Sequence, residues 1–237
     1  MKLKAKSSSW IEKAKERAAL EAVKHVRDDY IVGLGSGSTA AYAIKEMGKV
    51  TRQKNWQILG VPTSYQAMQL ATEYGIKTTT LSQHPQLDLT IDGADQIDEE
   101  LNLIKGMGGA LTREKIVASA SKKVVIVADE RKLVEKLGTN HPVPIEVLPF
   151  AVATVILKIQ EMKGKPRIRE TSGKVGPLVT DNGNFILDVD FGTIDVPGKL
   201  DSQLQFIPGV VETGIFAGLA DIVYLGTKNT VRKLKKR

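Results

Sequence analysis

Short apolar segments that alternate with amphipathic ones constrain the fold of this 237-residue chain more than any other feature. Several of these segments, such as 30–32 and 124–127, are apolar throughout. Strands of this kind are buried on both faces, and the helices between them provide the crossovers of a parallel sheet. We therefore predict an α/β fold, a Rossmann-like and mostly parallel sheet with helices on both faces.

The expected elements follow one another along the first half of the chain. The segment 11–27 has one apolar stripe among charged residues, which predicts a helix. Thr63 or Ser64 is a candidate N-cap for a later helix, which Gly75 ends. Helices are expected at 11–27, 40–47, 63–74 and 111–119, and strands at 30–32, 57–61, 76–80, 87–91 and 124–127.

The pattern changes near residue 138, which indicates a second structural unit. We expect a strand at 142–147, a helix at 150–162, a strand at 165–170 and a hairpin at 178–189. The hairpin is indicated by Asp-Asn-Gly-Asn at 181–184 between apolar runs, and strand-like apolar runs return at 211–225. The prediction is a discontinuous α/β domain, 1–137 with 209–237, and an inserted α+β domain at 138–208.

The residue composition excludes several kinds of site. The chain has no cysteine, which rules out disulfides, thiolate catalysis and cysteine metal sites. Its histidines, His25, His84 and His141, lack ligand spacing, so we expect no metal. The sequence contains no run of 18 apolar residues, which a membrane-spanning helix would need. The N-terminus lacks the apolar core of a signal peptide. Cytoplasmic residence is therefore expected.

The net charge of +7 is concentrated at the two ends of the chain. The basic residues at the ends are Lys2, Lys4, Lys6, Arg232, Lys233, Lys235, Lys236 and Arg237. Without these eight, the rest of the chain carries about −1. A nucleic-acid-binding face normally loads the folded body with basic residues, whereas basic tails are more often solvated ends. We therefore expect no nucleic-acid partner and no membrane partner.

A glycine-rich loop, Gly33 to Thr39, lies between an expected strand and an expected helix. Glycines allow a close approach of the backbone, and Ser36, Ser38 and Thr39 add hydroxyls where a helix N-terminus favours an anion. There is no Walker Gly-Lys-Ser/Thr sequence. The dinucleotide fingerprint is also incomplete, because Ser38 occupies its last glycine position. The loop thus indicates a phosphate cradle or, alternatively, only a tight turn.

Two further segments carry ionisable groups at expected strand or helix ends. Asp92-Gly93-Ala94-Asp95 ends a strand, where its carboxylates suit Mg²⁺ binding, acid–base chemistry or a plain Asp-Gly turn. The segment Lys105–Lys115 combines a cation, a glycine-rich turn whose N–H groups suit an oxyanion, and a helix start. Glu114, near the start of this helix, could take part in the reaction at such a site, or it could only offset the helix dipole. Lys132 is a phosphate ligand or an ordinary surface lysine.

Taken together, these segments resemble the A-type ribose-5-phosphate isomerase family. The matching segments are Gly35–Thr39, Asp92–Asp95, Lys105–Lys115, Val179–Asn184 and Ile207–Val211. The resemblance spans nearly the whole chain in one order. Met107 stands where the family often has glycine, and Gln96 stands where it often has glutamate.

The resemblance implies an enzyme that interconverts ribose 5-phosphate and ribulose 5-phosphate through an enediol, in the non-oxidative pentose phosphate pathway. It implies that Glu114 is the base and that Asp92 and Lys105 assist ring opening and proton movement. The implied substrate-binding residues are Ser36, Gly37, Ser38, Thr39, Asp92, Gly93, Ala94, Asp95, Lys105, Gly106, Met107, Gly108 and Lys132. No cofactor is expected, the partner is a small sugar phosphate, and the implied assembly is a homodimer or homotetramer.

Three other functions are compatible with parts of the sequence. One is another activity on a related scaffold, such as an amino-sugar-phosphate isomerase or a coenzyme A transferase. A second is a sugar-phosphate-sensing regulatory domain, although the N-terminus has room for only one helix before the first strand. The third is a nucleotide-dependent dehydrogenase, which the incomplete fingerprint disfavours.

Overall fold

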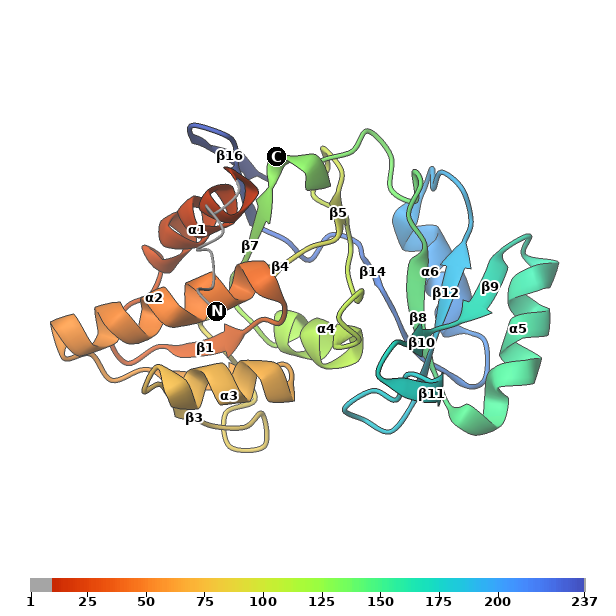
Figure 1. The fold of residues 1–237 in the computed structure, drawn as a ribbon, viewed down its shortest axis with the longest axis horizontal. Helices are drawn as coiled ribbons and strands as arrows, with labels where there is room; N and C mark the ends of the chain where they lie inside the picture. The colour runs from red at the N-terminus through yellow and green to blue at the C-terminus, as the bar shows by residue number, and fades with distance from the viewer. Residues whose placement is uncertain (1–9, 237) are drawn as a thin grey trace, which may run out of the picture.

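A computed structural model describes residues 10–236 and contains two main sheets (Figure 1). The central sheet has seven strands in the order β16-β15-β7-β4-β1-β2-β3. Their bounds are β1 Ile31–Leu34, β2 Leu59–Pro62, β3 Lys77–Thr78, β4 Leu89–Gly93, β7 Val124–Asp129, β15 Ile222–Gly226 and β16 Val231–Lys235. All neighbours pair in parallel except β15 and β16. The predicted fold class is confirmed.

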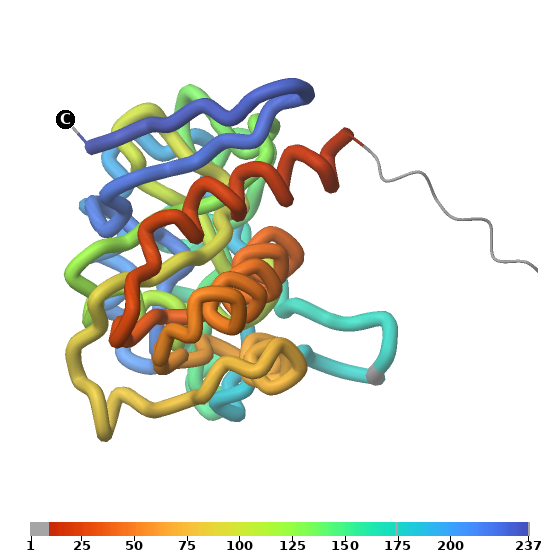
Figure 2. The backbone as a smooth tube through the Cα atoms, turned by 90° about the vertical axis from the view of Figure 1, so that its left-hand side faces the viewer, coloured from red at the N-terminus to blue at the C-terminus, as the bar shows by residue number. Residues whose placement is uncertain are grey.

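Helices cover both faces of the central sheet because its strands are apolar on both sides. Val125 and Val127 of β7 point into a core shared with α1 Trp10–Val23, α2 Ser38–Lys54 and α3 Tyr65–Glu73. The alternate residues Ile126 and Ala128 face the opposite core, which includes Ala118 of α4 Leu111–Ser119. In Figure 2, α1 runs beside the hairpin of β15 and β16, in agreement with its packing. No helix among residues 10–236 is long and apolar enough to cross a bilayer.

The second, small sheet has four strands in the order β13-β8-β12-β9, all antiparallel. Its strands are β8 Val143–Val147, β9 Lys165–Ile168, β12 Phe185–Asp190 and β13 Val210–Thr213. The remaining elements are β5 Gln96–Ile97, β6 Leu103–Ile104, η1 Glu130–Lys132, η2 Pro149–Ala151, α5 Val152–Glu161, β10 Glu170–Thr171, β11 Lys174–Pro177, α6 Pro197–Gln205 and β14 Ile215–Phe216. The domain division at 138 and 209 stays a prediction. By sheet membership, β13 belongs with the small sheet.

Several expected elements differ from the structure in extent or partner. The helix expected at 40–47 runs from Ser38 to Lys54, and α6 was not anticipated. The expected hairpin at 178–189 is reduced to a single bridge between Val179 and Phe185, because β12 pairs instead with β8 and β9.

The basic C-terminal residues are not a solvated tail. Arg232, Lys233 and Lys235 belong to β16, the outermost strand of the central sheet, which pairs antiparallel with β15. Val231 packs against the core under α1, which gives this short strand an apolar anchor. The basic residues 2, 4, 6 and 237 lie outside the described residues.

A buried carboxylate explains the polar motif near residue 180. Glu146 of β8 is fully buried and accepts hydrogen bonds from Thr180 Oγ1 at 2.8 Å and from Asn184 Nδ2 at 2.8 Å. It also accepts one from Asn182 Nδ2 at 3.1 Å and one from Thr112 Oγ1, in the first turn of α4, at 2.5 Å. Buried polar groups persist when they are hydrogen-bonded, and this network ties α4 to the small sheet.

Candidate functional site

Three loops meet at the carboxyl edge of the central sheet, because β1, β4 and β7 are parallel neighbours. Ligands of open α/β sheets bind at this edge. A cavity of about 190 Å³ lies there. Its lining residues are Lys15, Ser36, Gly37, Ser38, Thr39, Gly93, Ala94, Asp95, Lys105, Gly106, Gly108, Glu114, Asp129, Arg131 and Lys132. Of the residues predicted for the site, Asp92 and Met107 are not part of this lining.

The loop after β1 presents the N-terminus of α2 to this cavity. Gly37 precedes the helix without a side-chain cap, so the first N–H groups of α2 are available to an anion. Ser36 is held by hydrogen bonds from its Oγ to Ser64 Oγ at 2.6 Å and with Thr63 Oγ1 at 2.8 Å. Gly35 passes so close to Asp92 that a Cβ there would lie 2.1 Å from the carboxylate. The fold therefore requires glycine at position 35.

Asp92, Lys105 and Glu114 come together in one buried cluster, and their exposed fractions are 2%, 3% and 4%. Lys105 Nζ lies 2.9 Å from Asp92 Oδ2 and 3.3 Å from Glu114 Oε1. It also donates to the carbonyl of Gly93 at 2.7 Å. The other oxygen of Glu114, Oε2, has no hydrogen-bond partner among the described residues. An unpartnered buried acceptor beside a cavity is a candidate for contact with a ligand.

The protonation of this cluster follows from its burial and its neighbours. Burial, reinforced by the Asp92 carboxylate and opposed by Lys105, raises the pKa of Glu114 to about 8. Burial also raises the pKa of Asp92, although Lys105 opposes this. For Lys105, burial disfavours the ammonium, but Asp92 and Glu114 outweigh it and raise the pKa above its usual range. A base with a pKa near working pH is suited to moving a proton in both directions.

The glycine-rich turn after Lys105 forms the wall of the cavity next to Glu114. Gly106 has φ +107°, a conformation that favours glycine, whereas Met107 is not among the non-glycine residues with positive φ. Methionine therefore meets no backbone strain at position 107. Its N–H donates to Asp95 Oδ2 at 3.0 Å, so Asp95 supports the turn as well as lining the cavity.

Two basic residues reach the cavity from outside the motifs considered above. Lys15 of α1 donates to Ser38 Oγ at 3.1 Å, beside the N-terminus of α2. Arg131 is bound to Asp129 and lies next to Lys132 on η1. Neither residue is indicated by the sequence, because a lysine on an amphipathic helix and a charged Asp-Glu-Arg-Lys segment are both typical of an ordinary protein surface.

No group of three or more His, Asp or Glu side chains among residues 10–236 is arranged to hold a metal ion. Asp92 and Glu114 approach each other, but the Lys105 ammonium lies between them.

The family model of ribose 5-phosphate isomerase A (phosphoriboisomerase A) matches residues 59–230. The chain belongs to this family. A Methanothermobacter thermautotrophicus protein named ribose-5-phosphate isomerase A is 52% identical over 221 residues, covering 93% of this chain and 97% of the relative. A Pyrococcus horikoshii protein of the same name is 48% identical over 227 residues, covering 95% and 99%. The isomerase resemblance inferred from the motifs is therefore confirmed.

Solved structures of ribose 5-phosphate isomerases superimpose closely on this one. The Methanocaldococcus jannaschii enzyme aligns with a TM-score of 0.92 at 46% identity, covering 95% of this chain and 99% of that one. A D-ribose-5-phosphate isomerase in complex with phospho-erythronic acid aligns with a TM-score of 0.93 at 47% identity, with the same coverage. This agreement over nearly the full length identifies the chain as an isomerase and disfavours a transferase, a dehydrogenase or a regulatory domain.

Proposed function

We propose that the cluster of Asp92, Lys105 and Glu114 carries out the reaction of the family, the interconversion of ribose 5-phosphate and ribulose 5-phosphate. The observation that carries this proposal is the geometry of Glu114. Its Oε2 has no hydrogen-bond partner among the described residues, and the side chain lines the cavity 3.3 Å from a buried ammonium. Removal of a proton beside a carbonyl needs a carboxylate on one side and positive charge at the developing enediolate.

In the proposed mechanism, Glu114 takes the proton from C2 of the open-chain aldose. The electrons of that C–H bond form the C1–C2 double bond, while the carbonyl electrons move to O1, which is then protonated. Loss of the O2 proton and return of the proton from Glu114 to C1 give the ketose. Asp92 and Lys105 assist ring opening and the proton movements at the sugar oxygens, and Asp95 binds sugar hydroxyls. The Lys105 ammonium lies close enough to Glu114 to stabilise charge on those oxygens.

The phosphate end of the substrate is assigned to residues 36–39. Two observations support this assignment: the N-terminus of α2 has no side-chain cap, and the basic residues Lys15 and Lys132 line the same cavity. Anchoring the phosphate away from the reacting carbons fixes the orientation of C1 and C2 at Glu114. Gly93, Ala94, Gly106, Met107 and Gly108 complete the proposed substrate-binding set.

The activity is tested by a coupled assay of ribulose 5-phosphate formation from ribose 5-phosphate, with and without EDTA. We expect equal turnover in both conditions and no requirement for an added cofactor. Absence of turnover in either condition would contradict the proposed activity. Turnover that EDTA abolishes would contradict the metal-free mechanism alone.

Substitution of Lys132 by alanine is expected to raise KM about tenfold with little change in turnover number, since a charge-assisted contact to phosphate contributes about 1.5–3 kcal/mol. Steady-state kinetics with ribose 5-phosphate measure both constants. Lys136→Ala is the matched control, because this exposed lysine pairs with Asp195 and does not line the cavity. An unchanged KM in Lys132→Ala would remove Lys132 from the phosphate site.

The proposed setting is the cytoplasm, which the lack of cysteine supports. A homodimer or homotetramer is the proposed assembly. Three large apolar side chains near the small sheet support this proposal. Phe150 and Phe206 are 102% and 86% exposed, and Leu148 is 48% exposed. Large exposed apolar side chains of this kind are typical of protein–protein contacts.

A further inference from the structure

The glycine-rich turn beside Glu114 is held from behind by an arginine of the small sheet region. Arg169 lies between β9 and β10 and is 8% exposed. Its Nη1 donates to the carbonyl of Gly106 at 2.7 Å and to the carbonyl of Met107 at 3.1 Å. The motifs that indicated the site did not include this residue.

The guanidinium of Arg169 is itself fixed on its other side. Nε donates to Asp188 Oδ2 at 2.8 Å, and Nη2 donates to Asp188 Oδ1 in a bidentate pair. Asp188 belongs to β12, in the middle of the small sheet. A planar fork with donors on two sides can bridge a carboxylate and two carbonyls at once, which a lysine ammonium does not do in the same geometry.

These contacts determine where the N–H groups of the turn point. In a planar trans peptide the carbonyl and the N–H point in opposite directions. The carbonyl of Met107 is directed to Arg169, so the N–H of Gly108, in the same peptide, is directed away from it. Gly108 lines the cavity, and its N–H has no hydrogen-bond partner within residues 10–236. The N–H of Met107, in the preceding peptide, donates to Asp95.

We propose that Arg169 is a positioning residue, which holds the Gly106–Gly108 turn so that the Gly108 N–H faces the oxygen on which charge develops. This inference rests on the proposed reaction at Glu114 and assigns its second enediolate donor, in addition to Lys105. Arg169 also polarises both peptides of the turn, because its positive charge lies at their carbonyl ends. Preorganised N–H donors of this kind stabilise an oxyanion without reorganisation during the reaction.

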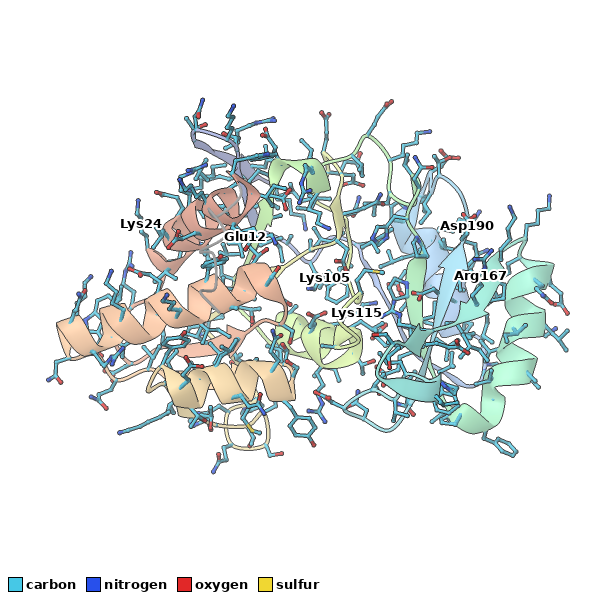
Figure 3. All side chains as sticks on the ribbon, in the orientation of Figure 1. Glu12, Lys24, Lys105, Lys115, Arg167 and Asp190 are labelled. Carbon is cyan, nitrogen blue, oxygen red and sulfur yellow. The ribbon has the colours of Figure 1, made fainter. Side chains whose placement is uncertain are left out.

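An open cavity lies beside Arg169, and a second arginine that can serve as a matched control lines the same cavity. The cavity measures about 810 Å³, and its lining includes Arg169, Asp188, Arg167 and Asp190. Arg167 and Asp190, labelled in Figure 3, lie in the small sheet, whereas Lys105 lies between the two sheets. Arg167 is exposed, and among the described residues the hydrogen bonds to the Gly106 and Met107 carbonyls come from Arg169 and not from Arg167, which is only two residues away.

The test compares Arg169→Ala with Arg167→Ala. We expect Arg169→Ala to lower the turnover number about tenfold or more, with KM changed by less than about twofold, because one donor is misplaced and the phosphate anchor is intact. Binding of phospho-erythronic acid, whose carboxylate mimics charge at the reacting carbons, should weaken in parallel. Binding of inorganic phosphate should not change. Guanidinium ion, entering through the cavity, should restore part of the turnover of Arg169→Ala, and Arg167→Ala should resemble the parent.

Two results would overturn the assignment. One is a turnover number for Arg169→Ala within about twofold of the parent, which would mean that the donor does not depend on Arg169. The other is an equal loss of affinity for inorganic phosphate and phospho-erythronic acid, which indicates general damage to the site.

If Arg169→Ala does not fold, Arg169→Lys takes its place. It keeps a cation beside Asp188 but cannot bridge both carbonyls, so a parent-like turnover number in that variant also overturns the proposal. Failure of the parent itself to isomerise ribose 5-phosphate would instead contradict the proposed function.

Discussion

Replacement of Glu114 by glutamine is expected to lower the turnover number for ribose 5-phosphate by about 100-fold or more, because an amide cannot take the C2 proton. The amide has nearly the same shape as the carboxyl group, so the fold should remain. Steady-state kinetics and circular dichroism measure the two effects. Glu161→Gln is the control, because this exposed glutamate of α5 pairs with Lys158 on the surface and, within residues 10–236, with no other basic residue. Near-full activity in Glu114→Gln would exclude Glu114 as the base.

The raised pKa of Glu114 also gives this substitution a signature in stability. The carboxyl group binds its proton more tightly in the folded chain, with a pKa of about 8, than at its ordinary value of 4.5. Its contribution to stability is therefore complete below about pH 4.5 and is lost as pH rises to about 8. Glutamine does not ionise, so the Glu114→Gln variant does not lose this stability as pH rises. Above pH 8 the variant should therefore have a higher thermal unfolding temperature than the parent. In the parent, kcat/KM should rise with pH toward the same pKa, since the base must be ionised.

Substitution of Lys105 by methionine is expected to lower the turnover number by about 100- to 1000-fold, because the developing enediolate loses its nearest cation. It should also destabilise the fold by about 3–5 kcal/mol, since the buried carboxylate of Asp92 loses the ammonium that lies 2.9 Å from it. Urea unfolding measures the second effect. Lys122→Met is the matched control, because Lys122 is exposed and pairs with Asp88 at the surface.

A second Lys105 variant tests the electrostatic role even if Lys105→Met folds poorly. In Lys105→Gln, the amide can still donate to the Gly93 carbonyl, but the positive charge that lowers the pKa of Glu114 is gone. The pKa of Glu114 should then rise further above its present value. The rise of kcat/KM with pH should accordingly shift to higher pH. An unshifted profile would show that Lys105 and Glu114 are not coupled during catalysis.

The local sequence was sufficient to predict the parts of this molecule that depend on neighbouring residues. The apolar strands predicted the parallel sheet, and Asp92 and the loop after β1 were each expected at a strand end, which the parallel order of β1 and β4 brings to one edge. Lys105 and Glu114 are candidates from the pattern of 105–115, the family resemblance implies their roles, and in the structure their side chains approach to 3.3 Å. Their roles remain proposals.

Other features depend on contacts between distant segments, which a sequence pattern does not encode. Arg169 and Asp188 look like ordinary charged residues of polar strands until the small sheet brings them behind the turn at Gly106. Nothing in the sequence around Glu146 indicates that four side chains, from Thr112, Thr180, Asn182 and Asn184, donate hydrogen bonds to it. The helix α6 begins with Pro197-Gly198, a pair typical of turns, so tertiary packing outweighed a weak local propensity.

The antiparallel strand β16 also bears on how copies of this chain behave in concentrated solution. An unpaired border of a sheet invites another backbone to add to it, and natural proteins discourage this with lysine-rich or very short border strands. One border of the central sheet is β16, with Arg232, Lys233 and Lys235, and the other is the two-residue strand β3. The clustered positive charge therefore protects against aggregation by edge-to-edge pairing, a purpose that requires no anionic partner.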